Sequence, residues 1–324
     1  MKRKSLLFVW SYVFILSTIF ISCKDTDNSV FGDDFDFPVL TDANTIRFTV
    51  NVTGDWCQLN IVADGGRMVI DWGNGRMQKV EDPSSMAGGV TYRYGNKGSY
   101  NVRIWAEELQ LIDISGLLIS ISDLHLGNMP RMKSLVLNSI TDTRELNLNT
   151  FCPNVESINI GSFADLEHLE VEHCSRLRNI QIYSNLTSME LGNHPEVEEL
   201  YCSYNGFSSF SLKGLPKLRS VDLGYNSALA SLELDENNGI NALLISGCAF
   251  QSVDDVLECC PSLNELSCSG NRLTELDLTK HLSIRELHCD HNRLTRLLVP
   301  EGQYFGHLYC HSNQLGEAAL KTLF

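Results

Sequence analysis

Residues 263–292 read LNELSCSGNRLTELDLTKHLSIRELHCDHN, and one pattern of residues occurs twice in this stretch. Leu263 begins the first copy, apolar residues follow three and five positions later, and Asn271 comes at the eighth. The second copy begins at Ile284, 21 residues further on. We number each copy from its first apolar residue, which is position 0. Positions 3 and 5 point to the same side of a strand because side chains alternate, so each copy predicts one short β-strand with two buried residues.

The same pattern extends far beyond this stretch. Ten copies begin between residues 109 and 305, at spacings of 20 to 23 residues. A constant period of this length predicts a solenoid, in which each copy forms one turn and stacks on the next. The ten copies begin at Leu109, Met132, Val155, Leu177, Val197, Leu218, Ile240, Leu263, Ile284 and Phe305.

Position 8 is asparagine in six of the ten copies. An asparagine side chain donates and accepts hydrogen bonds, so it can satisfy backbone groups in the turn that leaves the strand. The first three copies carry Leu117, Ile140 and Phe163 instead, which predicts less regular N-terminal turns. Cys248 fills the position in a seventh copy, and the six asparagines are Asn185, Asn205, Asn226, Asn271, Asn292 and Asn313.

A second apolar series follows the first in many copies, as in Leu273-Leu276-Leu278, and it predicts that the opposite wall is also extended. The pattern LxxLxLxxN resembles the leucine-rich repeat family over residues 109–313. That resemblance implies a β-rich solenoid with one continuous core. The final run LGEAALKTLF, residues 315–324, breaks the pattern and predicts a short helix that caps the open end.

The chain has 11 cysteines, which in an exported protein would suggest disulfides. Their positions favour another interpretation, because seven of them recur at position 5 or three residues before position 0. We expect free, buried thiols that act as small apolar residues, and the absence of a CxxC pair argues against zinc. The seven are Cys152, Cys174, Cys202, Cys260, Cys268, Cys289 and Cys310.

The first 22 residues have the features of an export signal. Basic residues 2–4 precede the uncharged run 6–21, which is short for a bilayer-spanning helix, and Ser22-Cys23 follows. This arrangement resembles a bacterial lipoprotein signal, and the resemblance implies acylation of Cys23 and a lipid anchor in the outer membrane. CKDTD, residues 23–27, resembles a tag that directs lipoproteins to the outer surface. An uncleaved anchor is the alternative, and residues 23–43 predict a flexible acidic tether.

Residues 44–106 predict a small β-sandwich, because apolar and polar residues alternate and turn signals lie between them. Asp71-Trp72-Gly73-Asn74-Gly75, then Tyr92 and Tyr94, then 98–102 resemble a PKD-like domain, although Asn74 stands where that family has an aspartate. The resemblance implies a spacer or a binding module. We expect Trp56 and Trp72 to pack in the core rather than to stack on sugars.

The candidate binding surface lies on the outward positions 2, 4 and 6 of the solenoid strands. In the last two copies the spacing places Glu286 beside His307. In the same way it places His288 beside Tyr309 and Asp290 beside His311. Carboxylate–imidazole pairs could bind a divalent metal or respond to pH, but we expect a polar recognition surface with no metal and no cofactor. The candidate ligand-binding residues are Tyr183, Tyr201, Asp222, Glu286, His288, Asp290, His307, Tyr309 and His311.

The net charge and the absence of catalytic motifs exclude some classes of function. The formal net charge of −15 argues against nucleic acid as a partner. The sequence lacks a nucleophile elbow, a phosphate loop, an HExxH helix and a calcium loop, so we predict no catalysis. We predict a monomeric surface lipoprotein that binds a protein ligand, and the alternative is a glycan-binding accessory lipoprotein of a nutrient-uptake system. The predicted fold is mostly β, with a small N-terminal β-sandwich (44–106) followed by a leucine-rich repeat solenoid (107–324) of about ten repeats of 20–23 residues.

Overall fold

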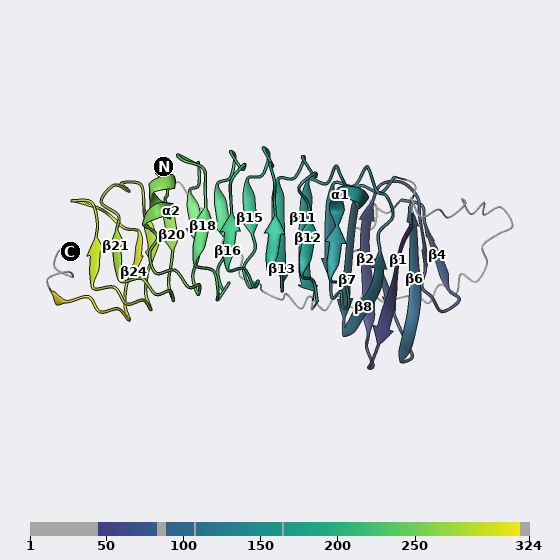
Figure 1. Cartoon of the computed structure of the whole chain (residues 1–324). Coiled ribbons are helices and arrows are strands. Elements are labelled where there is room, and N and C mark those ends of the chain that lie inside the picture. The colour runs from purple at the N-terminus through teal and green to yellow at the C-terminus, as the bar shows by residue number, and fades with distance from the viewer. Residues whose placement is uncertain (1–44, 83–88, 107, 164, 318–324) are drawn as a thin grey trace, which may run out of the picture. The chain divides into compact units, whose positions relative to one another are not determined.

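A computed structural model describes residues 45–82, 89–106, 108–163 and 165–317, without the side chains of residues 162 and 163. All of these residues lie within the unit Val39–Phe324 (Figure 1). The predicted signal, the tether and most of the predicted C-terminal helix lie outside the described residues. None of the helices in the described ranges is long and apolar enough to cross a membrane.

The N-terminal part forms a β-sandwich of two layers. One layer is a five-stranded sheet with the order β4-β3-β6-β1-β8, and the other is formed by β5, β2 and β7. Apolar side chains alternate along the strands and meet between the layers, as Ile46, Phe48 and Val50 of β1 do. The strands are β1 (Thr45–Val52), β2 (Gln58–Asp64), β3 (Met68–Asp71), β4 (Met77–Val80), β5 (Val90–Arg93), β6 (Gly98–Ala106), β7 (Leu111–Leu117) and β8 (Ile119–His125).

The two tryptophans of the sandwich differ in their environment. Trp72 is buried, and its ring stacks on Tyr92 with the centroids 4.6 Å apart. Trp56 is 69% exposed, so the expectation that it packs in the core was wrong. The physical reason is local: Trp56 lies in the turn between β1 and β2 with a φ of 68°, and its ring contacts the guanidinium of Arg93 at 4.9 Å.

The sandwich and the solenoid share strands. β7 pairs antiparallel with β2 on one side and parallel with β9 (Ser134–Asn138) on the other. β8 pairs with β1 and completes the five-stranded layer. The sheet therefore runs without a break across the sequence boundary at 106/107, and the first solenoid strand closes one face of the sandwich core.

The solenoid contains a ladder of ten strands, one for each predicted copy, which confirms the predicted fold class (Figure 1). Its neighbouring strands are parallel and in register at position 3, so that Leu266 lies between Leu243 and Leu287. After β7 and β9 the ladder continues with β11 (Ser157–Phe163), β13 (Asn179–Ser184), β15 (Glu199–Tyr201), β17 (Ser220–Asp222), β19 (Ala242–Leu244), β20 (Glu265–Ser267), β22 (Glu286–His288) and β24 (His307–Tyr309).

The opposite wall is extended, as the second apolar series predicts. Five of its seven short strands bury their central residue, for example Leu276 of β21, which is paired with Leu297 of β23. Two short helices, α1 (Leu148–Phe151) and α2 (Asp254–Cys259), interrupt this wall. The strands are β10 (Glu145–Asn147), β12 (His168–Glu170), β14 (Ser188–Glu190), β16 (Ser209–Ser211), β18 (Ser231–Glu233), β21 (Glu275–Asp277) and β23 (Arg296–Leu298).

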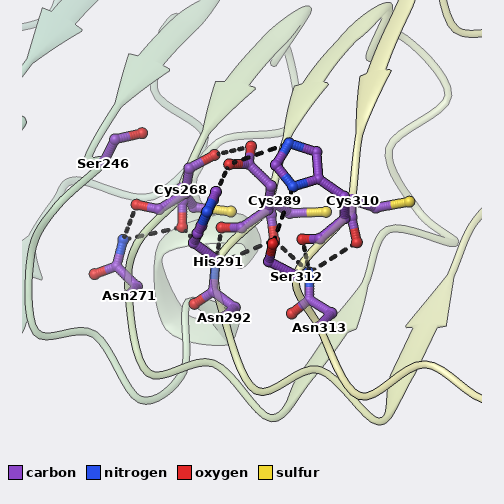
Figure 2. A network of polar contacts seen from close by, with 12 residues as sticks. Ser246, Cys268, Asn271, Cys289, His291, Asn292, Cys310, Ser312 and Asn313 are labelled. Atoms are coloured by element: carbon purple, nitrogen blue, oxygen red, sulfur yellow. Dashed lines mark hydrogen bonds and ion pairs between the residues drawn. The ribbon is translucent and has the colours of Figure 1, made fainter.

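Asparagine side chains at position 8 form a second ladder below the strands (Figure 2). The Nδ2 of Asn292 donates to the carbonyl oxygens of Cys289 in its own copy, at 3.2 Å, and of Cys268 in the preceding copy, at 2.9 Å. Its Oδ1 accepts from the backbone N–H of Leu273 at 3.0 Å. Each such side chain thus bridges two turns, as predicted. The same arrangement recurs at Asn205, Asn226, Asn271 and Asn313.

Two predicted turn residues depart from this ladder. Asn185 is exposed, because β13 stays extended through Ser184 and its copy is the shortest, at 20 residues. Leu117 is 54% exposed, because β7 continues along β2 instead of turning inward at position 8. The first four ladder strands have 5 to 7 residues and the later ones 3, so the less regular N-terminal turns were predicted correctly.

The cysteines of the described residues are all free. Cys202, Cys268 and Cys289 are fully buried at position 5, where each sulfur packs in the apolar core. At position 8, the Cys248 thiol donates to the carbonyl oxygen of Leu223 at 3.4 Å, which is the bond that asparagine makes to the preceding copy elsewhere. The expectation of free thiols as small apolar residues is therefore confirmed for these positions.

Candidate functional site

The outward face of the ladder consists of the side chains at positions 2, 4 and 6. On the three-residue strands the middle residue is buried and its two neighbours are partly exposed, as in β15, β17 and β22. None of the thirty residues at these positions is Lys or Arg, whereas six are Asp or Glu. Five of the six lie in copies 5, 6, 8 and 9, so the C-terminal half of this face is anionic. The six are Asp113, Glu199, Asp222, Glu265, Glu286 and Asp290.

The structure brings together the three C-terminal pairs that the spacing predicts. β22 and β24 pair so that Glu286 faces His307, with Oε1 and Nδ1 3.6 Å apart. The rings of His288 and Tyr309 are stacked, with centroids 4.6 Å apart and planes 27° apart. The third pair is Asp290 and His311, whose Oδ2 and Nε2 are 3.9 Å apart. We call these six residues, with His291, the C-terminal patch.

His291 belongs to this patch, although it is not among the candidate residues that the sequence predicts. Its Nδ1 lies 2.6 Å from Oδ2 of Asp290, and its ring meets the His311 ring edge-on with centroids 5.0 Å apart. His291 is at position 7 of its copy, whereas the alternation of side chains along a strand predicts only positions 2, 4 and 6 as outward. The signal was present in the sequence, because His291 follows Asp290 directly and lies 20 residues before His311.

A pair of exposed tyrosines was also missed. Tyr204 and Tyr225 occupy position 7 of adjacent copies, and each has a φ of 58°. Their rings stack face to face, with centroids 4.5 Å and planes 8° apart, yet the residues are 61% and 55% exposed. The left-handed backbone turns both side chains out to one side of the sheet, where they form the aromatic platform. Gly247 and Gly270 continue the same left-handed column in the next two copies.

The three remaining candidate residues lie on the middle strands and are less exposed. Tyr201 is half-buried, and its hydroxyl donates to Ser220 Oγ at 3.4 Å. Asp222 accepts from the backbone N–H of Gly224 at 2.9 Å, which holds the turn that carries the platform. Tyr183 is also half-buried, one copy before Tyr201. These three side chains are therefore less accessible to a partner than the exposed side chains of the C-terminal patch.

Burial affects several acids of the outward face. It raises the pKa of Asp222, and the N–H of Gly224 and the Ser203 hydroxyl oppose that shift. Burial also raises the pKa of Glu265, with a further contribution from the neighbouring Glu286 carboxylate. At Asp290 burial acts in the same direction, but hydrogen bonds from Ser269 and His291 outweigh it and lower the pKa. Among Asp222, Glu265 and Asp290, the carboxylate of Asp290 is therefore the one whose charged form is best stabilised.

No protein-family model and no curated protein matches this chain. Among solved structures, the chain is similar to the functional domain of InlJ from Listeria monocytogenes, a domain that includes a cysteine ladder. The TM-score is 0.54 at 24% identity, over 63% of this chain and 45% of that one.

Two further solved structures are similar at lower scores. One is the LRIM1/APL1C complex, with a TM-score of 0.48 and 17% identity over 57% of this chain and 40% of that one. The other is the leucine-rich repeat domain of APL1B, with a TM-score of 0.48 and 17% identity over 60% of this chain and 72% of that one. This chain spans less than half the length of the first two matches. The fold is thus that of leucine-rich repeat proteins, and the match to InlJ supports it.

Proposed function

We propose that this chain is a non-catalytic, lipid-anchored cell-surface protein that binds a protein partner through the outward face of its strand ladder. The N-terminal sandwich would act as a PKD-like spacer between the anchor and the ladder. The resemblance of the first 27 residues to a lipoprotein signal supports the anchor. The rows of exposed side chains on a rigid sheet support the binding role, because such surfaces need little reorganisation to bind.

The aromatic platform is the observation that carries this proposal. Large apolar side chains are normally covered in a monomer, but Tyr204 and Tyr225 are mostly exposed and are held in one orientation by their stacking. Tyrosine offers a large contact area and loses little conformational entropy on binding, which is why it is frequent at the energetic centres of interfaces. Position 7 has a left-handed backbone in copies 5 to 10, and glycine, which suits it best, fills it in only two of them, so the turn itself does not call for a tyrosine.

The charge of the face indicates the chemistry of the partner. The outward positions carry six carboxylates and neither lysine nor arginine. A protein with a basic surface would be attracted to this face, and the attraction would weaken as salt screens it. We therefore propose a basic protein surface as the partner.

Glycan binding is the second candidate, and exposed aromatic side chains favour it. Trp56 is exposed and held in place by Arg93 at 4.9 Å, and Tyr204 with Tyr225 offers a second aromatic surface. Flat aromatic faces can stack on sugar rings as well as on protein side chains. In that case the protein would be an accessory lipoprotein of a nutrient-uptake system.

An array of proteins and glycans, probed with the purified chain, tests the function. We expect a basic protein among the binders, and we expect a Tyr204→Ala/Tyr225→Ala variant to lose at least tenfold in affinity. Tyr304→Ala is the matched control, because Tyr304 is 75% exposed but comes one residue before position 0 of its copy and not at an outward position. Equal loss in both variants would reject the platform as the binding site. Binding to glycans alone, lost in a Trp56→Ala variant, would favour the second candidate.

The anchor has its own test. Cells fed a fatty-acid analogue should label the wild-type chain and not the Cys23→Ala variant. Protease treatment of intact cells should then remove the wild-type protein if it faces outward. Equal label on both chains would reject lipidation at Cys23 without affecting the binding proposal.

A further inference from the structure

We propose that Asp290, His291 and His311 form a binding site for one divalent transition-metal ion of the zinc, nickel and copper class. This proposal does not depend on the protein-binding function above. It reverses the expectation from the sequence, which considered the pairs Glu286–His307 and Asp290–His311 without His291 and favoured a surface that binds no metal. Two side chains rarely hold such an ion, but two imidazoles and one carboxylate are a common ligand set.

The three donor groups converge on one point of the outward face. One ligand atom from each residue lies within 4.8 Å of the ligand atoms of the other two. Donor atoms around a tetrahedral zinc ion are about 3.4 Å apart, given metal–ligand bonds of about 2.1 Å. The Asp290 Oδ2 to His311 Nε2 distance of 3.9 Å needs a small contraction, and the 2.6 Å contact from Oδ2 to His291 Nδ1 opens once an ion replaces the shared proton.

Each of two ligands is oriented by a second side chain, as in many natural metal sites. Ser269 donates its hydroxyl to Oδ1 of Asp290 at 2.6 Å, which leaves Oδ2 turned toward both imidazoles. Nδ1 of His311 lies 3.2 Å from the hydroxyl of Ser312, so its Nε2 is the nitrogen that faces Asp290. Figure 2 shows His291 and Ser312 within this network, close to the labelled asparagine ladder.

The third ligand is the imidazole of His291, and its backbone conformation orients it. Its φ of 53° lies in the left-handed region, and its N–H donates to the carbonyl oxygen of His311 at 3.1 Å. Histidine tolerates this region better than most non-glycine residues. Two earlier copies have glycine here, Gly247 and Gly270, and two have tyrosine, so the repeat itself does not require a histidine. A histidine in this strained position has a clear use if it completes a ligand set.

The donor types define the class of ion. Imidazole nitrogens suit zinc, nickel and copper, whereas calcium and magnesium prefer sites made of oxygen. Both histidines are exposed and Asp290 is half-buried, so an ion could enter from solvent and retain water at its remaining positions. Such an open site could also accept a ligand from a bound partner.

Calorimetric titration of the purified chain with Zn²⁺, Ni²⁺ and Cu²⁺ tests the proposal. We expect one ion per chain, with at least tenfold weaker binding in Asp290→Asn, His291→Asn and His311→Gln. Asparagine is chosen at position 291 because it also tolerates a left-handed backbone. The matched control is His307→Gln, which breaks the neighbouring imidazole–carboxylate pair with Glu286 and should bind as wild type does.

Electron paramagnetic resonance of the Cu²⁺-loaded chain gives a second measurement that does not depend on affinity. In the wild type the spectrum should show nitrogen couplings from two coordinated imidazoles. In His291→Asn and in His311→Gln it should show the couplings of one imidazole. Thermal unfolding of each variant without metal verifies that it is folded. The proposal fails if wild type binds none of the three ions, or if His307→Gln weakens binding as much as the cluster variants do. It also fails if folded cluster variants keep wild-type affinity and couplings.

Discussion

The ring of Tyr225 lies so close to Gly247 that a Cβ atom on this glycine would come within 2.8 Å of the ring carbon Cδ1. The two residues are at position 7 of adjacent copies, and both have a left-handed backbone. Gly247 therefore leaves room for one face of Tyr225, while Tyr204 stacks on the other face. The aromatic platform depends on three successive copies and not on its two tyrosines alone.

Gly247→Ala should disturb the platform more than Gly270→Ala does. Both glycines have similar φ values, 68° and 66°, so both alanines carry a similar backbone strain of about 1 kcal/mol. Only the Cβ at position 247 would meet Tyr225, since at position 270 the nearest atom lies at 3.5 Å. Near-ultraviolet circular dichroism and thermal unfolding of both variants measure the difference. Identical tyrosine spectra and identical melting temperatures would show that Tyr225 does not rest on Gly247.

Asn292→Ala should destabilise the solenoid by about 1–3 kcal/mol, because it leaves buried backbone groups of two turns without partners. Asn292→Asp should be at least as harmful, since it keeps the acceptor but loses the bonds that Nδ2 donates to the carbonyl oxygens of Cys268, Cys289 and Asp290. Glu301→Ala, at an exposed turn, should stay within about 0.5 kcal/mol of wild type. Urea unfolding measures all three. A wild-type midpoint for Asn292→Ala would contradict the bridging role.

The buried thiols should react only after unfolding. Burial raises the pKa of the Cys268 thiol to about 12 and that of Cys152 to about 12, so neither is a thiolate at pH 8. In a Cys23→Ala background, a thiol reagent should label the native chain slowly and the denatured chain completely. Cys259 is partly exposed and should be the faster site by mass spectrometry, next to the slow Cys260. Loss of label after denaturation without reductant would instead indicate disulfides.

Acid should destabilise the fold through His194. This side chain is fully buried, and burial lowers its pKa, while the backbone of Leu191 and Cys174 opposes the shift. The unfolded chain then binds more protons than the folded one, so stability falls as the pH drops below about 6.5. The pKa of His281 is lowered by burial in the same way and adds to the effect.

His194→Leu should therefore reduce the loss of stability between pH 7 and pH 5. Leu215 fills the same position in the next copy and is buried, so leucine suits this site. Melting temperatures of wild type and variant across that range provide the measurement. An exposed histidine, as in His168→Leu, is the control and should keep the wild-type slope. Parallel curves for wild type and His194→Leu would contradict the assignment.

The repeat could be predicted from the sequence because its information is local and is repeated ten times. Position 3 is apolar in all ten copies, and position 8 is asparagine in six of them, at spacings of 20 to 23 residues. The three pairs of the C-terminal patch could be predicted from the spacing of the copies, because parallel strands in register place equal positions side by side. The departures at Leu117 and Asn185 arose where strands were longer than the template.

The sequence by itself thus determined the ladder, its register and the side chains of its outward face. Only the tertiary structure decided which turn residues join that face. Tyr204, Tyr225 and His291 follow strand ends, where a left-handed φ turns the side chain toward the neighbouring copy. The conformation of one such residue depends on hydrogen bonds to the next turn, as from His291 N–H to the carbonyl oxygen of His311. These contacts span about 20 residues of chain, so no pattern within a single copy reveals them. Stacking of the turns creates both the aromatic platform and the histidine cluster.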